Sequence, residues 1–179
     1  APGLHFAHLK TELFALPGVP SEAEEMLREY VMPFLKTITV GQERGLRVIR
    51  TIGIGESSLA ERLTGFEMEE PDLKLGFIAR PSGVDVHVSA ASRDAAWLDA
   101  VLDRGERKIR ERSGRYAFGR GRETLSEAVG RALLAQNLTI ATAESFTGGA
   151  VGADLTATPG SSRYYRGGVV AYSNDAKEA

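Results

Sequence analysis

Two apolar, β-branched runs near the C-terminal end of the chain flank a run of small residues, and this pattern constrains the fold most. Residues 138–143 and 167–172 are typical of strands, and residues 150–156 between them are typical of a short helix. A strand, a helix and a second strand in this order predict a parallel strand pair joined by a crossover. The chain is therefore expected to be an α/β protein.

The first 36 residues form a block that is too small to fold alone. Residues 4–16 contain two short strand-like runs, and a Pro/Gly segment ends them. Ser21 and Glu24 have the spacing of a capping box, which predicts a helix that starts at Ser21. Pro33 is expected to end or kink this helix.

Residues 37–118 form a second block with the element order β-α-β-β-α, the order of a small α+β sandwich. Ser58 and Glu61 have the spacing of another capping box. Residues 66–72 are acidic and contain a proline, so we expect a solvated loop there. The predicted elements are strands at 37–40 and 46–52, a helix at 59–63, a hairpin of 73–79 with 84–90, and a helix at 93–112.

Residues 119–179 form the third block. A linker is predicted at 119–122, and Thr124 with Glu127 predicts a capping box at the start of a helix. Residues 175–179 are typical of the first turn of a helix and contain no stop signal. Because the chain also opens without Met, we expect it to be a fragment of a longer chain.

Composition excludes several classes of protein. The 179 residues carry 22 Lys and Arg against 24 Asp and Glu, a net charge of −2, which argues against a strongly basic nucleic-acid binder. The chain has no Cys, so disulfides, zinc–thiolate sites and a thiolate nucleophile are excluded. It has no visible signal peptide and no apolar run of the roughly 18 residues that a membrane span needs. We expect a cytoplasmic protein with no membrane partner.

The strongest local candidate for a binding site is the turn after the first C-terminal strand, with the sequence AESFTGG at 143–149. The first N–H groups of the following helix have no partner within the helix and carry positive potential. Gly148 and Gly149 allow a ligand to approach the backbone. The pattern is typical of a phosphate or carboxylate site, and an ordinary capped helix start is the competing interpretation. It is not a Walker loop, because the Lys after the glycines is missing.

A second candidate combines Ser161 or Ser162 with Tyr172 and Lys177. A serine needs a base to act as a nucleophile, and the third block contains no His. A Tyr or Lys serves instead where burial or a neighbouring positive charge lowers its pKa. Tyr172 at a strand end and Lys177 one helical turn further on have a spacing that suits one pocket. The competing interpretation is a strand-end tyrosine and a surface lysine.

A third candidate is basic: eight Lys or Arg lie between positions 104 and 122, with Tyr116 and Phe118 among them. Such a stretch contacts phosphates in some nucleic-acid-binding proteins, but a solvated helix face followed by a linker is the commoner cause. Nucleic-acid binding is therefore not expected. The three His residues lack a nearby carboxylate cluster, so a metal site is not expected either.

Several stretches, taken together and in order, resemble the CinA family of competence/damage-inducible proteins. Residues 16–22 (LPGVPSE) resemble a motif near the end of the family's molybdopterin-binding-like domain, and residues 50–61 (RTIGIGESSLAE) resemble its KH-like domain. Three further stretches resemble its C-terminal domain, namely TAESFTGG at 142–149, PGSS at 159–162 and GGVVAYSN at 167–174. The resemblance implies the tail of the first domain at 1–36, a KH-like domain at 37–118 and the first part of a three-layer α/β amidase domain at 119–179.

The resemblance implies a nicotinamide-nucleotide amidase, which hydrolyses the carboxamide of nicotinamide mononucleotide to nicotinate mononucleotide and ammonia in pyridine-nucleotide recycling. It implies Ser162 as the nucleophile, with Ser145 as the alternative, and Tyr172 and Lys177 as the groups that activate it and transfer protons. The implied substrate-binding residues are Glu144, Thr147, Gly148, Gly149 and Asn174. No cofactor or metal is implied for the amidase site, a divalent metal is implied only for the N-terminal domain, and a homodimer is expected.

Two departures from the family pattern qualify this expectation. Phe146 stands where the family usually has Cys, and the family's C-terminal domain continues well beyond residue 179. We therefore expect the chain alone to have little or no activity. The alternatives are a nucleic-acid-binding or dimer-assembly module built on the KH-like domain, or the remnant of an ADP-ribose pyrophosphatase. The absence of a G-x-x-G loop argues against specific RNA binding by the KH-like domain.

Overall fold

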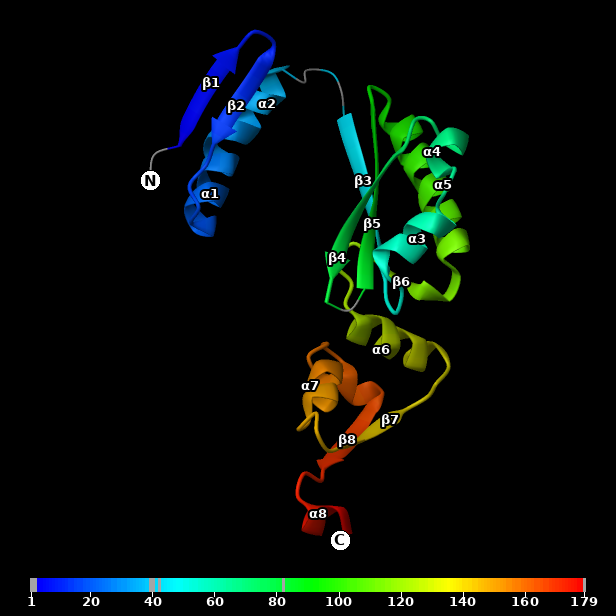
Figure 1. Cartoon of the computed structure of the whole chain (residues 1–179). Helices are drawn as coiled ribbons and strands as arrows, with labels where there is room; N and C mark the ends of the chain where they lie inside the picture. The colour runs from blue at the N-terminus through cyan, green and yellow to red at the C-terminus, as the bar shows by residue number, and fades with distance from the viewer. Residues whose placement is uncertain (1–2, 39–40, 42, 82, 179) are drawn as a thin grey trace. The chain divides into compact units, whose positions relative to one another are not determined.

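A computed structural model describes residues 3–38, 41, 43–81 and 83–178 of the chain. It divides into two compact units, one formed by Ala1–Glu43 with Ser92–Asp94 and the other by Arg44–Ala91 with Ala95–Ala179. The mixed α/β class expected from the sequence is confirmed, and Figure 1 shows the order of the elements. Among the described residues, no helix is both long and apolar enough to cross a membrane.

The N-terminal unit is a hairpin followed by one long helical stretch. The two strand-like runs predicted within residues 4–16 are strands β1 (Leu4–His8) and β2 (Thr11–Ala15), and they pair antiparallel. Helix α1 (Pro20–Met26), a π-helical turn (Leu27–Val31) and α2 (Met32–Ile38) follow without a break. The predicted capping box is wrong, because the helix begins at Pro20 behind Val19 and no side chain caps it.

Pro33 lies within this helical stretch and does not end it. Proline has no N–H to donate to the preceding turn. The wider π-helical turn directly before it, in which Met32 donates its N–H to the carbonyl of Leu27, accommodates the proline. The strand predicted at 37–40 is wrong for residues 37 and 38, which end α2, and its other two residues lie outside the described ranges.

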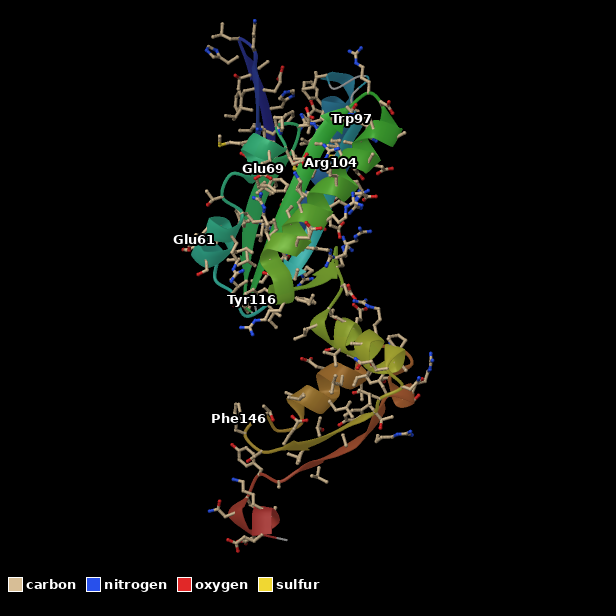
Figure 2. All side chains as sticks on the ribbon, turned by 90° about the vertical axis from the view of Figure 1, so that its right-hand side faces the viewer. Glu61, Glu69, Trp97, Arg104, Tyr116 and Phe146 are labelled. Atoms are coloured by element: carbon tan, nitrogen blue, oxygen red, sulfur yellow. The ribbon has the colours of Figure 1, made fainter. Side chains whose placement is uncertain are left out.

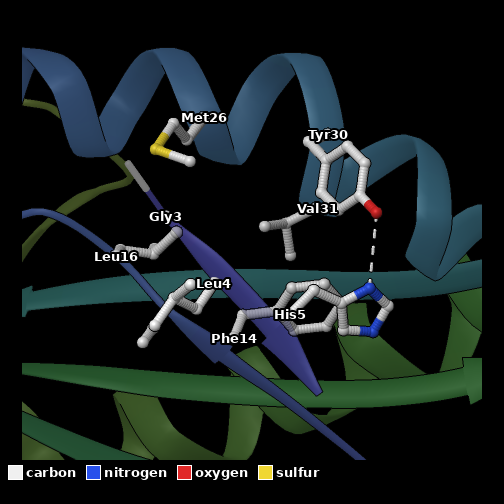
Figure 3. Close-up of a pocket in the computed structure, with 9 residues that line it drawn as sticks. Gly3, Leu4, His5, Phe14, Leu16, Met26, Tyr30 and Val31 are labelled. Atoms are coloured by element: carbon white, nitrogen blue, oxygen red, sulfur yellow. Dashed lines mark hydrogen bonds between the residues drawn. The ribbon is translucent and has the colours of Figure 1, made fainter. Parts of the chain in front are cut away.

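One face of the hairpin packs aromatic rings against the helical stretch. The His5 ring stacks on Phe14 with centroids 4.2 Å apart, and Phe34 meets the same ring edge-on at 4.7 Å. A pocket of about 370 Å³ lies beside them, and Figure 3 shows Tyr30 reaching His5 across it. The same ring is held on its other nitrogen, because Nε2 of His5 lies 2.7 Å from a carboxylate oxygen of Glu12.

The middle block is a four-stranded sheet with the strand order β4-β5-β3-β6. Helix α5 runs along one face of this sheet (Figure 1). The predicted hairpin and the predicted long helix are confirmed. The elements are β3 (Glu43–Thr51), α3 (Glu56–Arg62), α4 (Phe66–Glu69), β4 (Lys74–Arg80), β5 (Gly83–Ser92), α5 (Ala95–Ser113) and β6 (Ala117–Arg120).

The hydrophobic core of the middle block lies between the sheet and its helices. Alternate residues of β5 point into it, and helix α5 contributes a stripe at helical spacing. The apolar positions expected on this helix from the sequence were Ala96, Trp97, Ala100, Val101 and Ile109. Of these, Val101 and Ile109 are buried, together with Leu98 and Leu102, whereas the other three are exposed. The other core residues include Ile49, Leu59, Phe66, Leu73, Val84, Val86 and Val88.

Three sequence predictions in the middle block are wrong. Residues 66–72 are not a solvated loop, because Phe66 is fully buried and starts the short helix α4. Helix α3 begins at Glu56 behind Gly55 and has no capping box. The predicted linker at 119–122 begins inside the sheet, because Gly119 pairs with Arg50 as part of strand β6.

The third block contains α6 (Leu125–Ala135), β7 (Ile140–Glu144), α7 (Ala150–Thr156), β8 (Tyr165–Val170) and α8 (Asn174–Glu178). The capping box of Thr124 and Glu127 is confirmed in both directions. Strands β7 and β8 are parallel with α7 as the crossover, as predicted. Helix α6 approaches the buried Tyr164 closely at Gly130, where a Cβ atom would lie 2.7 Å from the tyrosine ring.

Candidate functional site

The turn between β7 and α7 holds the residues that the sequence singles out most strongly. Two consecutive residues, Gly148 and Gly149, have φ angles of 60° and 95°. Only glycine adopts such angles without strain, so the shape of the turn itself requires both residues. Hydrogen bonds from Gly148 to the carbonyl of Ser145 and from Ala150 to the carbonyl of Thr147 hold the turn in place.

The carboxylate of Glu144 occupies the N-terminus of α7. Its two oxygens accept hydrogen bonds from the backbone N–H groups of Val151 at 3.0 Å and Gly152 at 2.8 Å. The anion site predicted at this helix start is therefore taken by the chain's own side chain. No Ser or Thr side chain caps the helix, whose N-cap residue is Gly149, so Glu144 takes the place of the ordinary Ser/Thr cap that was the competing interpretation.

The surroundings of Glu144 keep it ionised. Burial raises the pKa of the Glu144 carboxyl, but hydrogen bonds from the amides of Gly152 and Val151 and from the hydroxyls of Thr147 and Thr142 outweigh it. The net result is a pKa below the ordinary value. Glu144 is thus a fixed negative charge at the carboxyl end of β7.

A small polar cluster surrounds Glu144 between β7, β8 and α7. The Thr142 hydroxyl lies 2.8 Å from the Tyr165 hydroxyl. A Cβ atom on Gly152 would lie 2.6 Å from the Tyr165 hydroxyl, and one on Gly168 would lie 2.3 Å from Thr142 Oγ1. Both glycines are therefore needed to make room for the cluster. Thr142 and Tyr165 were not predicted as site residues. Thr142 lies between the exposed Ala141 and Ala143, so strand alternation places it on the same face as Glu144.

The parallel pairing places the two candidate serines at opposite edges of the sheet. Ile140 at the start of β7 is aligned with Tyr165, and Glu144 at its end is aligned with Val170. Ser162 precedes β8 and so lies at the amino edge, whereas Ser145 follows β7 at the carboxyl edge. The intervening strand spans about 13 Å at the usual rise per residue.

The proposed base residues follow β8 and so share the edge of Ser145. The N–H of Ala171 bonds to the Glu144 carbonyl at 2.8 Å, which fixes the exit of β8 next to the turn after β7. Tyr172 comes next and is 70% exposed. Asn174 and Lys177 lie three positions apart on α8, whose start is capped by the hydroxyl of Ser173. The structure thus places the exit of β8, which Tyr172 follows, at the edge of Ser145, whereas Ser162 lies at the other edge.

Phe146 projects outward from the same turn (Figure 2). It is 90% exposed, so its ring does not narrow any pocket among the described residues.

The basic stretch between positions 104 and 122 is largely neutralised by ion pairs. Arg104 and Lys108 both contact the buried carboxylate of Glu70, at 2.8 and 2.6 Å. Arg110 and Arg120 both contact the buried Glu106, and Arg112 contacts Glu69. These contacts support the interpretation as a helix face rather than a nucleic-acid surface. Within the described ranges, no group of three or more His, Asp or Glu side chains is placed to hold a metal.

Two family models match the chain in succession. The model described as the Damage-inducible protein CinA KH domain matches residues 46–119, and that of the CinA C-terminal domain matches residues 122–179. The chain belongs to the CinA family. Of the five stretches that resemble this family, those at 50–61, 142–149, 159–162 and 167–174 lie within the matched ranges, and the one at 16–22 lies outside them.

Curated relatives agree with the CinA assignment over almost the whole chain. A CinA-like protein of Chlorobium limicola is 39% identical over 93% of the chain, and one of Salinibacter ruber is 42% identical over 91%. A putative competence-damage inducible protein of Caldicellulosiruptor saccharolyticus is 37% identical over 99%. The matched parts make up 39%, 40% and 43% of these proteins, so the chain spans about two fifths of their length.

Proposed function

We propose that this CinA chain contributes to a nicotinamide-nucleotide amidase that hydrolyses the carboxamide of nicotinamide mononucleotide to nicotinate mononucleotide and ammonia. The observation that carries the proposal is the shared carboxyl edge of β7 and β8, where Ser145, Tyr172 and Lys177 follow the ends of two adjacent parallel strands. Ligands of open parallel sheets bind at this edge.

Ser145 is the nucleophile in this proposal. Its hydroxyl oxygen attacks the carboxamide carbon while one of the two groups Tyr172 and Lys177, in its deprotonated form, takes up the hydroxyl proton. The C–N bond then breaks, and the nitrogen leaves as ammonia with that proton. A water molecule hydrolyses the resulting serine ester, which releases the carboxylate and restores Ser145.

The substrate contacts of the proposal come from the same edge. Thr147 and Asn174 provide side chains that can hydrogen-bond to the substrate. Gly148 and Gly149 have no side chains, so the substrate can approach the backbone of the turn closely. Glu144 supports these groups by fixing the start of α7 rather than by binding an anion itself, because its oxygens accept from Val151 and Gly152.

Ser162 takes part only if another copy of the chain supplies it. It lies at the amino edge of its own sheet, so it meets Tyr172 and Lys177 of a second copy or not at all. The expected homodimer thus has a specific chemical role in one version of the proposal. In that version Ser162→Ala removes activity, and mixed dimers of Ser162→Ala with Lys177→Ala regain part of it.

Ammonia release from nicotinamide mononucleotide tests the proposal. In the longest natural form of the protein, Ser145→Ala is expected to lower kcat/KM by about 10³-fold or more, because loss of a catalytic nucleophile has effects of that size. Arg107→Ala, on the exposed face of α5, serves as a control that keeps full activity. Full activity of Ser145→Ala, Tyr172→Ala and Lys177→Ala together would overturn the site.

A further inference from the structure

The face of the middle sheet away from its core carries a cluster of charged residues that the amidase proposal does not use. Ile49 and Thr51 of β3 and Val84, Val86 and Val88 of β5 are buried toward the core. Because side chains alternate along a strand, the residues between them point to the opposite face. These residues include Arg50 on β3 and Asp85 and His87 on β5.

A buried carboxylate holds two of the arginines in this cluster. Asp85 is 2% exposed, although it lies on the outer face, because the arginines cover it. Its Oδ1 is 2.6 Å from Arg50 Nε, and its Oδ2 is 2.9 Å from Arg80 Nε. Each carboxylate oxygen thus serves a different guanidinium group.

Arg50 is fixed from two further directions. Its Nη1 donates to the carbonyl of Glu123 at 3.1 Å, and its guanidinium lies 5.8 Å from the centre of the Phe118 ring. Fixed guanidinium groups lose little conformational entropy when they bind a ligand, so this arrangement is organised before any ligand arrives.

A pocket of about 430 Å³ lies against this cluster and is lined by Arg50, Arg80, His87 and Arg122. The side chain of Arg80 is half exposed, and its contact with Asp85 is made through Nε, so this contact does not use the two terminal nitrogens. Within the described part of the chain, Arg122 makes no ion pair. Three guanidinium charges against one carboxylate leave two positive charges unbalanced at this pocket.

We propose that this pocket binds the phosphate monoester group of a small molecule such as a nucleotide. A phosphate monoester carries a charge of about −1.5 to −2 at pH 7, which matches the unbalanced charge of the pocket. Its oxygens accept paired hydrogen bonds from guanidinium groups, which are the donors that the pocket offers.

The charges gather at one pocket and form no extended stripe, which favours a small ligand over a polynucleotide. Most other cations of the basic stretch at 104–122, to which Arg122 belongs, are paired with Glu69, Glu70 and Glu106. A polynucleotide needs a continuous track of unpaired cations, because each neutralised phosphate contributes to its affinity. The described surface offers one cluster instead.

Titration calorimetry on the full 179-residue chain tests the proposal with AMP and inorganic phosphate as probes and adenosine as the uncharged control. We expect AMP to bind with a Kd of about 1 mM or tighter and adenosine not to bind. Arg122→Gln should weaken AMP binding about tenfold or more, since one charge-assisted hydrogen-bonded contact is lost. The fold should be unchanged, because Arg122 supports no other described residue.

Arg107→Gln is the matched control, since it removes the same charge from the exposed face of α5, away from the pocket. It should leave AMP binding unchanged. No AMP or phosphate binding, or an equal loss in both variants, would overturn the proposal. Arg122-dependent binding of single-stranded DNA without any binding of AMP would overturn it in favour of a polynucleotide surface. Neither outcome depends on the amidase site, because nicotinamide mononucleotide and Ser145 take no part in the test.

Discussion

At the scale of single residues, Glu144 determines what the turn after β7 can do. A carboxylate that accepts two helix amides keeps the turn closed to external anions and holds Ser145 and Thr147 next to the start of α7. Glu144 thus has a positioning role in the proposed site, unlike the residues that are proposed to touch the substrate.

Glu144→Gln is expected to destabilise the C-terminal block. A glutamine side chain presents one acceptor and one N–H₂ group, so one of the two amides of α7 loses its partner and a buried donor is left unpaired. The midpoint of urea unfolding should fall relative to the wild-type chain. Glu178→Gln, an exposed change of the same charge, is the control that should leave the midpoint unchanged; equal midpoints for all three proteins would contradict the role of Glu144.

The same residue predicts a pH dependence. The native pKa of Glu144 lies below its ordinary value of 4.5, so the ionised form stabilises the fold fully above that value. This contribution is lost as the pH falls through the lowered native pKa, where the carboxylate is protonated in the folded state too. Urea midpoints of the wild-type chain should therefore fall more steeply with acidification than those of Glu144→Gln. Parallel pH profiles would contradict this expectation.

At the scale of elements, close packing at glycine positions controls how α6 meets the rest of the C-terminal block. Gly130 on α6 faces the ring of Tyr164, whose hydroxyl donates to the Leu155 carbonyl at 2.8 Å. A side chain at this position has to displace a buried, hydrogen-bonded tyrosine. The spacing of apolar residues along α6 gives no sign of this contact.

Gly130→Ala is expected to destabilise the block by about 1–3 kcal/mol, because overpacking a close contact has costs of this size. Helix propensity alone predicts the opposite sign, a gain of about 1 kcal/mol from the removal of a mid-helix glycine. Ala132→Gly on the exposed face of α6 measures that propensity difference in the same helix. If Gly130→Ala instead stabilised the block, Tyr164 would have to move away from the new side chain without lowering the free energy of unfolding.

Elements whose signals are local were predicted well from the sequence. The Thr124–Glu127 capping box, the hairpin of β4 and β5, and the parallel pair of β7 and β8 depend on short-range spacing or on element order. The failures have long-range causes. Helix α4 forms because the Phe66 ring is buried in the core between the sheet and α5. The acidic residues around Phe66 in the sequence indicate a solvated loop instead.

The candidate site was predicted only in part for the same reason. Composition and spacing identified the turn at 143–149 and the residues after β8. Which edge of the parallel sheet Ser145 and Ser162 occupy depends on strand pairing, and the sequence pattern alone does not give the register of that pairing. The Glu144 cap depends on side-chain direction, which a sequence pattern does not give.

At the scale of the whole molecule, the hydrophobic core belongs almost entirely to the middle block. The core cluster runs from Ile49 to Ile109, and Tyr116 and Ala117 pack against it. A chain of residues 43–121 is therefore expected to unfold cooperatively on heating, as measured by circular dichroism. A chain of residues 122–179 should show a weaker or broader transition, and a sharp transition in the second chain only would contradict this division.

The most direct test of the proposed function is the activity of variants in which one of the two serines is replaced. Ammonia release from nicotinamide mononucleotide should be followed for the longest natural form of the protein, for Ser145→Ala and for Ser162→Ala, with each variant checked for a native thermal transition. We expect Ser145→Ala to lose about 10³-fold or more in kcat/KM, whereas Ser162→Ala should retain most of its activity. Loss of activity in Ser162→Ala with full activity in Ser145→Ala would contradict the placement of the site at the carboxyl edge of β7 and β8.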